Sequence, residues 1–343
     1  MTQFIGVEDM RRLVRSTGTK AFLTQLADYI RHDFSRWPEF EKSARVASHS
    51  RDGVIELMPT SDGRLYSFKY VNGHPNNPKT AKLTVTAFGV LADVDCGYPL
   101  LISEMTLLTA LRTAATSAFA ASVLARRNSR VMALVGAGAQ SEFQALAFQA
   151  LLGIEEIRVY DPDVRAVDKF MANAAGFGMT LVRCATVADA VAGADVITVC
   201  TAVKGKVAVI DAAMLRPGTH INAIGGDCPG KTELHRNILE RGRYFTEFTP
   251  QTRIEGEIQQ AAPDYPVAEL WEVLASIKDG RTSAADITVF DSVGFAIEDF
   301  SALRLVHDLT EGKRRMVDLV PELDDPKNLY GELVGERTVA EVA

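Results

Sequence analysis

A short apolar run that meets a glycine turn constrains this chain more than any other feature. Val131–Val135 is a candidate buried strand, Gly136 and Gly138 follow at once, and a helical pattern begins near Ser141. The first glycine permits a tight turn, the second lets the backbone approach a pyrophosphate, and the helix N-terminus faces that anion. Ser141 stands where a third glycine is usual, so this dinucleotide-binding fingerprint is incomplete and depends on its context.

An acid ends the next candidate strand, which covers residues 157–161. Asp161 follows Gly136 by 25 residues, close to the spacing of about 20 in dinucleotide-binding folds. A carboxylate here can accept hydrogen bonds from both hydroxyls of an adenosine ribose and would repel a 2′-phosphate, so Asp161 favours NAD over NADP. An alternative is that Asp161 caps the helix that follows Pro162, and the two roles are compatible.

Candidate strands and helices keep alternating along the rest of the chain. Further strands are predicted at Thr180–Arg183, Asp195–Thr201, His220–Ile224, Tyr244–Glu247 and Ile287–Asp291. Such alternation implies a parallel sheet that is covered by helices. We therefore expect an α/β fold with a Rossmann-type, doubly wound parallel sheet.

The first 110 or so residues have a different pattern. Helices are predicted at Val7–Thr17, Thr19–Phe34 and Met105–Ala125, and strands at Ser43–Ser48, Val54–Pro59, Leu65–Tyr70, Thr84–Asp93 and Pro99–Ser103. A long helix predicted at residues 292–315 follows the last strand, so we expect the chain to return to its N-terminal part. The predicted organisation is a discontinuous α+β substrate-binding and dimerisation domain, residues 1–112 and 316–343, around an NAD-binding domain, residues 113–315.

Composition and charge exclude several classes of partner. Of the 343 residues, 47% are hydrophobic and 24% are charged, and the formal net charge is −7. That charge argues against nucleic acid or an anionic membrane surface as the main partner. We expect neither a membrane span nor a signal peptide. The cysteines form no CxxC pair and the histidines no cluster, so we expect no metal site, and a cytoplasmic protein with reduced thiols.

Four charged residues lie inside apolar segments of the N-terminal part. Arg45, Glu56 and Lys69 fall in candidate strands, and Arg112 falls in a candidate helix. Because a strand alternates its faces, any one of them can simply point to water. If the three cations and the acid converge, they form a carboxylate-binding site, since arginine binds carboxylates through two hydrogen bonds and lysine adds a point charge.

A second candidate region is the run that leads from the strand at 220–224 into Gly225, Gly226 and Asp227. Ligands of open parallel sheets bind at the carboxyl ends of the strands, so Asp227 lies where a general acid or base is expected. The alternative is that Asp227 caps a helix that starts near Lys231, although Pro229 and Gly230 stand between them.

Longer motifs in the chain resemble those of one known family. They are Lys42-Ser-Ala-Arg-Val-Ala-Ser-His-Ser50, Val54-Ile-Glu-Leu-Met-Pro59, Phe68-Lys-Tyr-Val-Asn-Gly-His-Pro75, Ala110-Leu-Arg-Thr-Ala-Ala115, Gly136-Ala-Gly-Ala-Gln140, Gly225-Gly-Asp-Cys-Pro-Gly-Lys-Thr-Glu-Leu234 and Phe290-Asp-Ser-Val-Gly-Phe295. By these motifs the chain is identified as a member of the ornithine cyclodeaminase/μ-crystallin family. The resemblance runs from the N-terminus to about Lys327.

The resemblance implies a cyclising ammonia-lyase that converts L-ornithine to L-proline and ammonia. In that reaction NAD takes a hydride from Cα, the δ-amine attacks the iminium carbon, ammonia leaves, and the cyclic imine takes the hydride back. By resemblance, Arg45, Lys69 and Arg112 would hold the substrate carboxylate, and Glu56 would bind a substrate ammonium. Asp227 would contact the substrate and move protons among the amines.

The resemblance also implies NAD as a recycled cofactor and a homodimer formed through the N-terminal sheets. The residues expected to line the cofactor are Thr84, Gly136, Gly138, Ala139, Gln140, Asp161, Thr201 and Ser292.

The sequence identifies the family more clearly than it identifies the substrate or the reaction. The substrate could be lysine, because discrimination by one methylene is worth only about 1–3 kcal/mol. The same motifs are also compatible with a ketimine reductase or amino-acid dehydrogenase, which would show net NAD(P)H turnover, and with a binding protein without catalysis. Asp227 favours the cyclodeaminase.

Overall fold

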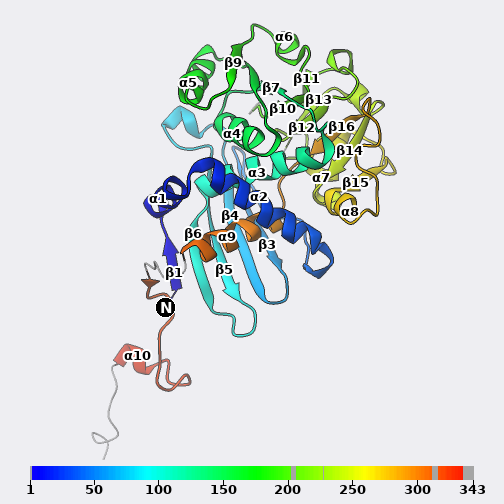
Figure 1. Cartoon of the computed structure of the whole chain (residues 1–343). Helices are drawn as coiled ribbons and strands as arrows, with labels where there is room; N and C mark the ends of the chain where they lie inside the picture. The colour runs from blue at the N-terminus through cyan, green and yellow to red at the C-terminus, as the bar shows by residue number, and fades with distance from the viewer. Residues whose placement is uncertain (1, 202–205, 227, 311–315, 335–343) are drawn as a thin grey trace, which may run out of the picture.

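The protein contains two large sheets with helices between and around them. The computed structural model describes residues 2–201, 206–226, 228–310 and 316–334. An eight-stranded and a seven-stranded sheet lie one above the other in Figure 1. The predicted acid Asp227 lies outside the described residues.

The eight-stranded sheet is parallel throughout and runs in the order β15-β14-β16-β12-β10-β7-β8-β9. Its strands are β7 (Val131–Val135), β8 (Glu156–Tyr160), β9 (Thr180–Arg183), β10 (Val196–Val199), β12 (His220–Ala223), β14 (Gly242–Thr246), β15 (Val267–Glu269) and β16 (Ile287–Asp291). The central strands β10, β12 and β16 are buried along their whole length, as expected for a sheet covered on both faces. The strand order reverses between β7 and β10, which is where such folds bind dinucleotides. The predicted α/β class with a Rossmann-type sheet is confirmed.

The seven-stranded sheet has the order β17-β1-β6-β5-β4-β3-β2, and all its pairs are antiparallel except β1 with β6. Its strands are β1 (Thr2–Ile5), β2 (Val46–His49), β3 (Val54–Ser61), β4 (Leu65–Gly73), β5 (Val85–Asp93), β6 (Pro99–Glu104) and β17 (Met316–Val317). Side chains alternate across the sheet, so one face is buried against helices and the other is exposed.

The helices are α1 (Val7–Thr17), α2 (Thr19–Ser35), α3 (Thr106–Leu124), α4 (Ser141–Leu152), α5 (Val164–Ala174), α6 (Val187–Val191), α7 (Thr249–Glu255), α8 (Leu270–Leu274), α9 (Ala296–Thr310) and α10 (Gly331–Val334). Short 3-10 helices occupy Trp37–Glu39, Asn77–Thr80, Ala212–Met214, Arg236–Ile238 and Glu257–Gln260. A further two-stranded parallel sheet pairs β11 (Lys206–Ile210) with β13 (Thr232–Leu234).

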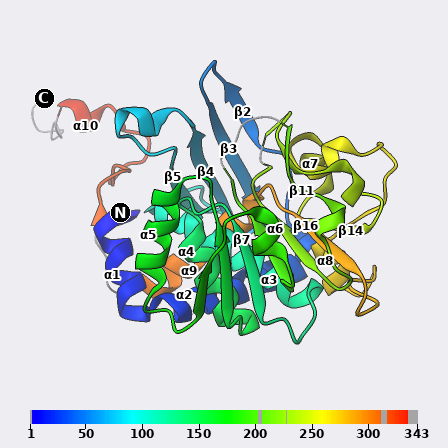
Figure 2. The same cartoon turned by 90° about the horizontal axis from the view of Figure 1, so that it is seen from above.

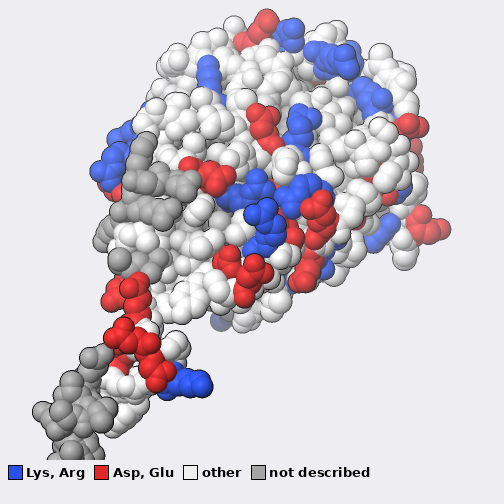
Figure 3. Space-filling model, turned by 60° about the horizontal axis from the view of Figure 1, so that its bottom comes forward, with Lys and Arg blue, Asp and Glu red and all other residues white. Residues whose placement is uncertain are grey.

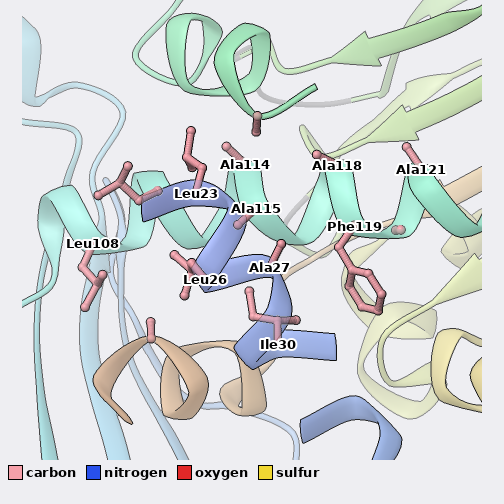
Figure 4. Packing of buried hydrophobic residues seen from close by; sticks show 14 of the residues in the cluster. Leu23, Leu26, Ala27, Ile30, Leu108, Ala114, Ala115, Ala118, Phe119 and Ala121 are labelled. Carbon is pink, nitrogen blue, oxygen red and sulfur yellow. The ribbon is translucent and has the colours of Figure 1, made fainter. Parts of the chain in front are cut away.

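The long helix α3 is the centre of the hydrophobic core. It packs against α2, α4 and α9, and Figure 4 shows Leu26, Ala27 and Ile30 of α2 near Ala115 and Phe119 of α3. By length and composition this helix could cross a membrane, but 67% of its apolar window is buried inside the molecule. Because it lies between layers of the same chain, α3 is a core helix of the fold.

After β16 the chain returns to the seven-stranded sheet. Helix α9 packs on α2 and on β4 and β5, and β17 pairs with β1 at the sheet edge. The division at residues 112 and 315 stays a prediction, since α9 contacts both α3 and the N-terminal strands. Beyond β17, residues 318–334 form an arm that extends away from the body (Figures 1 and 2).

One predicted element is wrong. The helix expected near Lys231 is instead the strand β13. A residue far away in the sequence stabilises this strand. The N–H groups of Glu233 and Leu234 donate to the carboxylate of Glu257 at 2.7 and 3.0 Å. Those donors are thus held by a side chain from another part of the chain, and the segment pairs with β11.

Candidate active site

The glycine turn at the end of β7 is built as a dinucleotide-binding fold requires. Gly136 has φ +104°, and a Cβ there would lie 2.7 Å from the carbonyl oxygen of Cys200 at the end of β10. A Cβ on Gly138 would meet nothing within 4 Å, so the backbone is open to a close approach at this point. Ser141, in the third glycine position, donates a hydrogen bond to the carbonyl of Gly138 at 2.7 Å and so closes the turn onto α4.

Asp161 lies at the end of β8, beside the glycine turn. Its carboxylate accepts hydrogen bonds from the N–H groups of Ala137 and Asp163, both at 2.8 Å. The cap of α5 is Asp163, whose side chain accepts from the N–H of Arg165, so the capping alternative for Asp161 is wrong. Asp161 thus connects the glycine turn after β7 to the end of β8. In dinucleotide-binding folds an acid at the end of this strand binds the ribose.

Ala139 and Gln140 complete the mouth of this turn. Ala139 is exposed next to Gly138, and Gln140 is the residue at which α4 begins. The first turn of α4 also holds Glu142, which forms an ion pair with Lys169 of α5 at 2.9 Å. Lys169 donates to the Gly138 carbonyl as well, at 2.9 Å, so α5 fixes the turn from the side.

A buried carboxylate connects the next two strand ends. Glu233 accepts hydrogen bonds from the N–H of Thr201, at 3.1 Å, and from its hydroxyl. The same carboxylate lies against Gly225, where any Cβ would overlap it. Glu233 therefore holds together Thr201, which was predicted to line the cofactor, and the turn before Asp227. Glu233 lies in one of the quoted motifs but was not predicted to belong to the site.

The loop after β16 links the cofactor side to the substrate side. Glu247, fully buried just after β14, accepts hydrogen bonds from the Ser292 hydroxyl and from the N–H groups of Val293 and Gly294. A Cβ on Gly294 would lie 2.7 Å from Nη1 of Arg112. Ser292, which was predicted to line the cofactor, is therefore two residues before Gly294, which packs against the predicted substrate-binding residue Arg112.

Lys69 and Arg112 come together on the buried face of the seven-stranded sheet, and both meet acids of α9. Lys69 Nζ lies 2.9 and 2.8 Å from the two carboxylate oxygens of Asp299. Arg112 Nε lies 2.9 Å from Asp299 Oδ1, and its Nη1 forms an ion pair with Glu298. All four side chains are at least nine-tenths buried. The expectation that these two cations could point to water is wrong.

Burial dominates the electrostatics of this group. It lowers the pKa of Lys69 to about 8, with the positive charge of Arg112 adding to the shift and Asp299 opposing it. Burial also raises the pKa of Glu298 to about 8, although the charge of Arg112 opposes the rise. Burial also raises the pKa of Asp291, at the end of β16, to about 7 and that of Glu257, in the short helix after α7, to about 8.

Arg45 and Glu56 complete the predicted set. Arg45 Nη1 lies 3.1 Å from Glu56 Oε2, and its Nε lies 3.2 Å from Glu255 Oε2 on α7. Its Nη2 donates to the carbonyls of Val293 and Gly294 at 2.6 and 2.9 Å. Arg45 therefore spans from the N-terminal strands to the strand ends of the parallel sheet, and its charge also helps to depress the pKa of Lys69.

The structure brings together most of the predicted site but not every member. Arg45, Glu56, Lys69 and Arg112 form one group, and Ser292 connects it to the strand ends that carry Thr201 and the glycine turn. Thr84 lies just before β5, where its carbonyl accepts from His74 N at 2.8 Å. Among the described residues no hydrogen bond joins Thr84 to the others, so its place at the cofactor stays a prediction.

The buried acids of α9 were missed at the level of sequence. Glu298 and Asp299 are adjacent charges inside the apolar run from Phe295 to Leu303. Two adjacent acids in a helix that is apolar around them must be paired if the helix is buried on all sides. That signal was present in the sequence and would have suggested partners for the predicted cations.

The chain matches known proteins along nearly its whole length. A model of the ornithine cyclodeaminase/mu-crystallin family covers residues 7–314. The ornithine cyclodeaminase of Agrobacterium fabrum is 61% identical over 333 residues, which cover 96% of this chain and 94% of the relative.

Two solved structures share the fold. A lysine cyclodeaminase, solved to explain its recognition of L-lysine, L-ornithine and L-2,4-diaminobutyric acid, has a TM-score of 0.90 at 29% identity, covering 96% of this chain and 98% of that one. An archaeal alanine dehydrogenase dimer with bound NAD has a TM-score of 0.85 at 29% identity, covering 93% and 99%. This chain belongs to the ornithine cyclodeaminase/mu-crystallin family.

Proposed function

We propose that this chain catalyses the NAD-dependent conversion of L-ornithine to L-proline and ammonia. The observation that carries the proposal is the convergence of Arg45, Lys69, Arg112 and Glu56 next to strand ends that bear a dinucleotide turn. The cations suit a substrate carboxylate, and Glu56 suits a substrate ammonium group; L-ornithine carries both kinds of group. The 61% identity to an ornithine cyclodeaminase supports ornithine as that substrate.

The residues of the glycine turn fit NAD. The open backbone at Gly138 admits a pyrophosphate, the N-terminus of α4 faces it, and Asp161 is placed to accept hydrogen bonds from ribose hydroxyls. Ala139, Gln140, Thr201 and Ser292 would line the same cofactor. When bound there, NAD supplies a hydride acceptor for the substrate Cα and returns the hydride at the end of the cycle.

The chain itself binds, orients and moves protons. The cations hold the substrate carboxylate, and Glu56 binds an ammonium group. Fixing the δ-amine next to Cα makes the ring closure intramolecular, and well-oriented reactions of this kind reach effective molarities of about 10⁵–10⁸ M. Asp227, by its resemblance to the family pattern, accepts protons from the amines and returns one to the leaving ammonia.

Asp161→Ala is expected to weaken NAD binding about ten- to a hundredfold and NADP binding much less. The reason is that a hydrogen bond to a charged acceptor is worth about 1.5–3 kcal/mol, whereas a 2′-phosphate gains nothing from the acid. Titration calorimetry with both cofactors measures the two dissociation constants. Asp163→Ala, which removes only the cap of α5, is the matched control. An unchanged ratio of the two constants would assign ribose recognition to another group.

The substrate is tested by ammonia release from L-ornithine, L-lysine and L-2,4-diaminobutyric acid at equal concentrations. We expect the highest kcat/KM with L-ornithine. A higher value with L-lysine would make this chain a lysine cyclodeaminase, the alternative that one methylene leaves open. Ammonia release that requires stoichiometric NAD would point to an amino-acid dehydrogenase of the same family.

We also propose that the protein is a cytoplasmic homodimer. The exposed face of the seven-stranded sheet carries apolar side chains that no element of the same chain covers in the described part of the structure. They are Val46, Ile55, Leu57, Tyr66 and Phe88. A contiguous apolar face of this kind is typical of a protein–protein interface. The archaeal alanine dehydrogenase with the same fold is a dimer, which supports a dimeric state for this chain.

Leu57→Lys is expected to shift the protein towards a monomer in size-exclusion chromatography with light scattering, because it places a charge in the middle of the apolar face. Val164→Lys, on the exposed side of α5, is the control and leaves the mass unchanged. A dimeric Leu57→Lys variant would rule out this face as the interface.

The distribution of charge on the surface is shown in Figure 3, where basic and acidic side chains lie interspersed on the face in view. A strongly basic surface of one sign is what nucleic acid or an anionic membrane would require. The face in view does not have this character.

A further inference from the structure

A site that holds one carboxylate with several cations must keep those cations close together before the substrate arrives. Lys69 and Arg112 are both buried, and each positive charge disfavours the other. Without a counter-charge, the burial of two cations in contact would be strongly unfavourable, because each loses its hydration. The protein therefore needs a buried acid that touches both cations and leaves donors of each available for a ligand.

Asp299 has the required geometry. Its Oδ1 lies 2.9 Å from Lys69 Nζ and 2.9 Å from Arg112 Nε, and its Oδ2 lies 2.8 Å from Lys69 Nζ. The three side chains come from β4, α3 and α9, so the acid joins three elements at one point. Glu298, its neighbour on α9, forms its ion pair with Arg112.

We propose that Asp299 is a positioning residue that holds Lys69 and Arg112 side by side for the substrate carboxylate and keeps Lys69 charged. This inference rests on the proposed function for its substrate, but its central contact can be measured without substrate. Asp299 does not touch the reacting atoms. It acts through the two cations, which have donors beyond those that it engages.

The groups that face Lys69 set its charge. They are Asp299 and the residue before it on α9, Glu298, together with Arg112 of α3 and Arg45 of the loop before β2. On the neighbouring strands Lys69 is paired with Met58 and Gly89, which carry no charge. Since the pKa of Lys69 is about 8, the lysine loses its proton above that pH and the site loses one cation. Asp299 opposes this loss, so its removal should move the loss to lower pH.

The first experiment is Asp299→Asn, a change that keeps the shape and removes the charge. We expect KM for L-ornithine to rise about tenfold or more while kcat changes less. We expect KM of the wild type to rise above about pH 8, and KM of Asp299→Asn to begin its rise at lower pH. The matched control is Asp33→Asn, which removes an equally buried acid that contacts Ser301 and Arg304 of the same helix α9. That control should leave KM and its pH profile unchanged.

A substrate-free measurement separates this inference from the proposed function. In protein with ¹³C-labelled lysine Cε, NMR titration reports the pKa of Lys69, which Lys69→Arg identifies by the loss of its signal. A lower pKa in Asp299→Asn supports the inference even if L-ornithine proves not to be the substrate. An unchanged pKa of Lys69, or an unchanged KM profile in an active Asp299→Asn variant, overturns it.

Asp299→Glu covers the case in which Asp299→Asn does not fold. The longer side chain keeps the charge but displaces the carboxylate from the point between the two cations. KM should then rise while its pH profile stays near that of the wild type. Unchanged KM in Asp299→Glu would overturn the positioning role.

Discussion

Arg112→Leu should lower kcat/KM for L-ornithine by about a hundredfold or more and should also destabilise the fold. The substitution removes a predicted carboxylate ligand, and losing one partner of a buried charge pair costs about 2–5 kcal/mol of binding free energy. It also leaves Glu298 without its ion-pair partner and leaves Asp299 with Lys69 alone. Breaking a buried pair typically lowers the free energy of unfolding by about 3–5 kcal/mol. Steady-state kinetics and urea unfolding measure the two effects separately.

Arg304→Leu is the matched control for this variant. Arg304 also extends from the core to a fully buried acid, Asp33, at 2.6 Å, but neither residue belongs to the site. Asp33 keeps Arg36 at 3.4 Å and Ser301 at 2.8 Å, so the loss of stability should be smaller. The kcat/KM of the folded control should equal that of the wild type. Equal kcat/KM values in Arg112→Leu and Arg304→Leu would remove Arg112 from substrate binding.

Asp227→Asn is the second change with a large expected effect. General acid–base catalysis contributes about 10²–10⁴-fold to rate, and the asparagine can no longer accept a proton. We therefore expect kcat to fall by about that factor, with the dissociation constant of NAD nearly unchanged. The two residues before this position, Gly225 and Gly226, are packed against the carboxylates of Glu233 and Glu257. This packing holds the backbone of these two glycines.

The measurement for Asp227→Asn is a single-turnover experiment with saturating NAD, together with calorimetric titration of the cofactor. Normal cofactor binding with lost turnover would place the defect in the chemical steps. Full activity of the variant would remove Asp227 from the mechanism and direct attention to the acids of the neighbouring strand ends. A large loss of NAD affinity would instead assign Asp227 to cofactor binding.

The sequence predicted the elements whose signals are local. β7 and α1 have the predicted bounds, because an apolar run before a glycine turn and an amphipathic helical repeat are each contained in a short window. β16 and β9 are likewise where the alternation placed them. The helix expected near Lys231 failed for the opposite reason. Its backbone donors are taken by Glu257, 24 residues away from Glu233, and no local pattern carries that information.

In the candidate site, too, the sequence predicted what depends on single residues and missed what depends on contacts between distant residues. The residue types of Arg45, Lys69 and Arg112 marked them as unusual in apolar segments, but their convergence depends on how β4, α3 and the loop before β2 meet. The acids that accompany them, Glu298 and Asp299, lie 186 residues beyond Arg112 and 230 residues beyond Lys69 along the chain. Only the tertiary fold brings such distant charges into contact.

A closed hydride cycle on L-ornithine is the core of the proposed function, and a single assay decides it. Purified protein is incubated with L-ornithine and a catalytic amount of NAD, and ammonia, proline and NADH absorbance are followed together. We predict equal amounts of ammonia and proline, both far above the amount of NAD, without accumulation of NADH. Steady accumulation of NADH in step with ammonia, with no proline formed, would contradict the closed cycle.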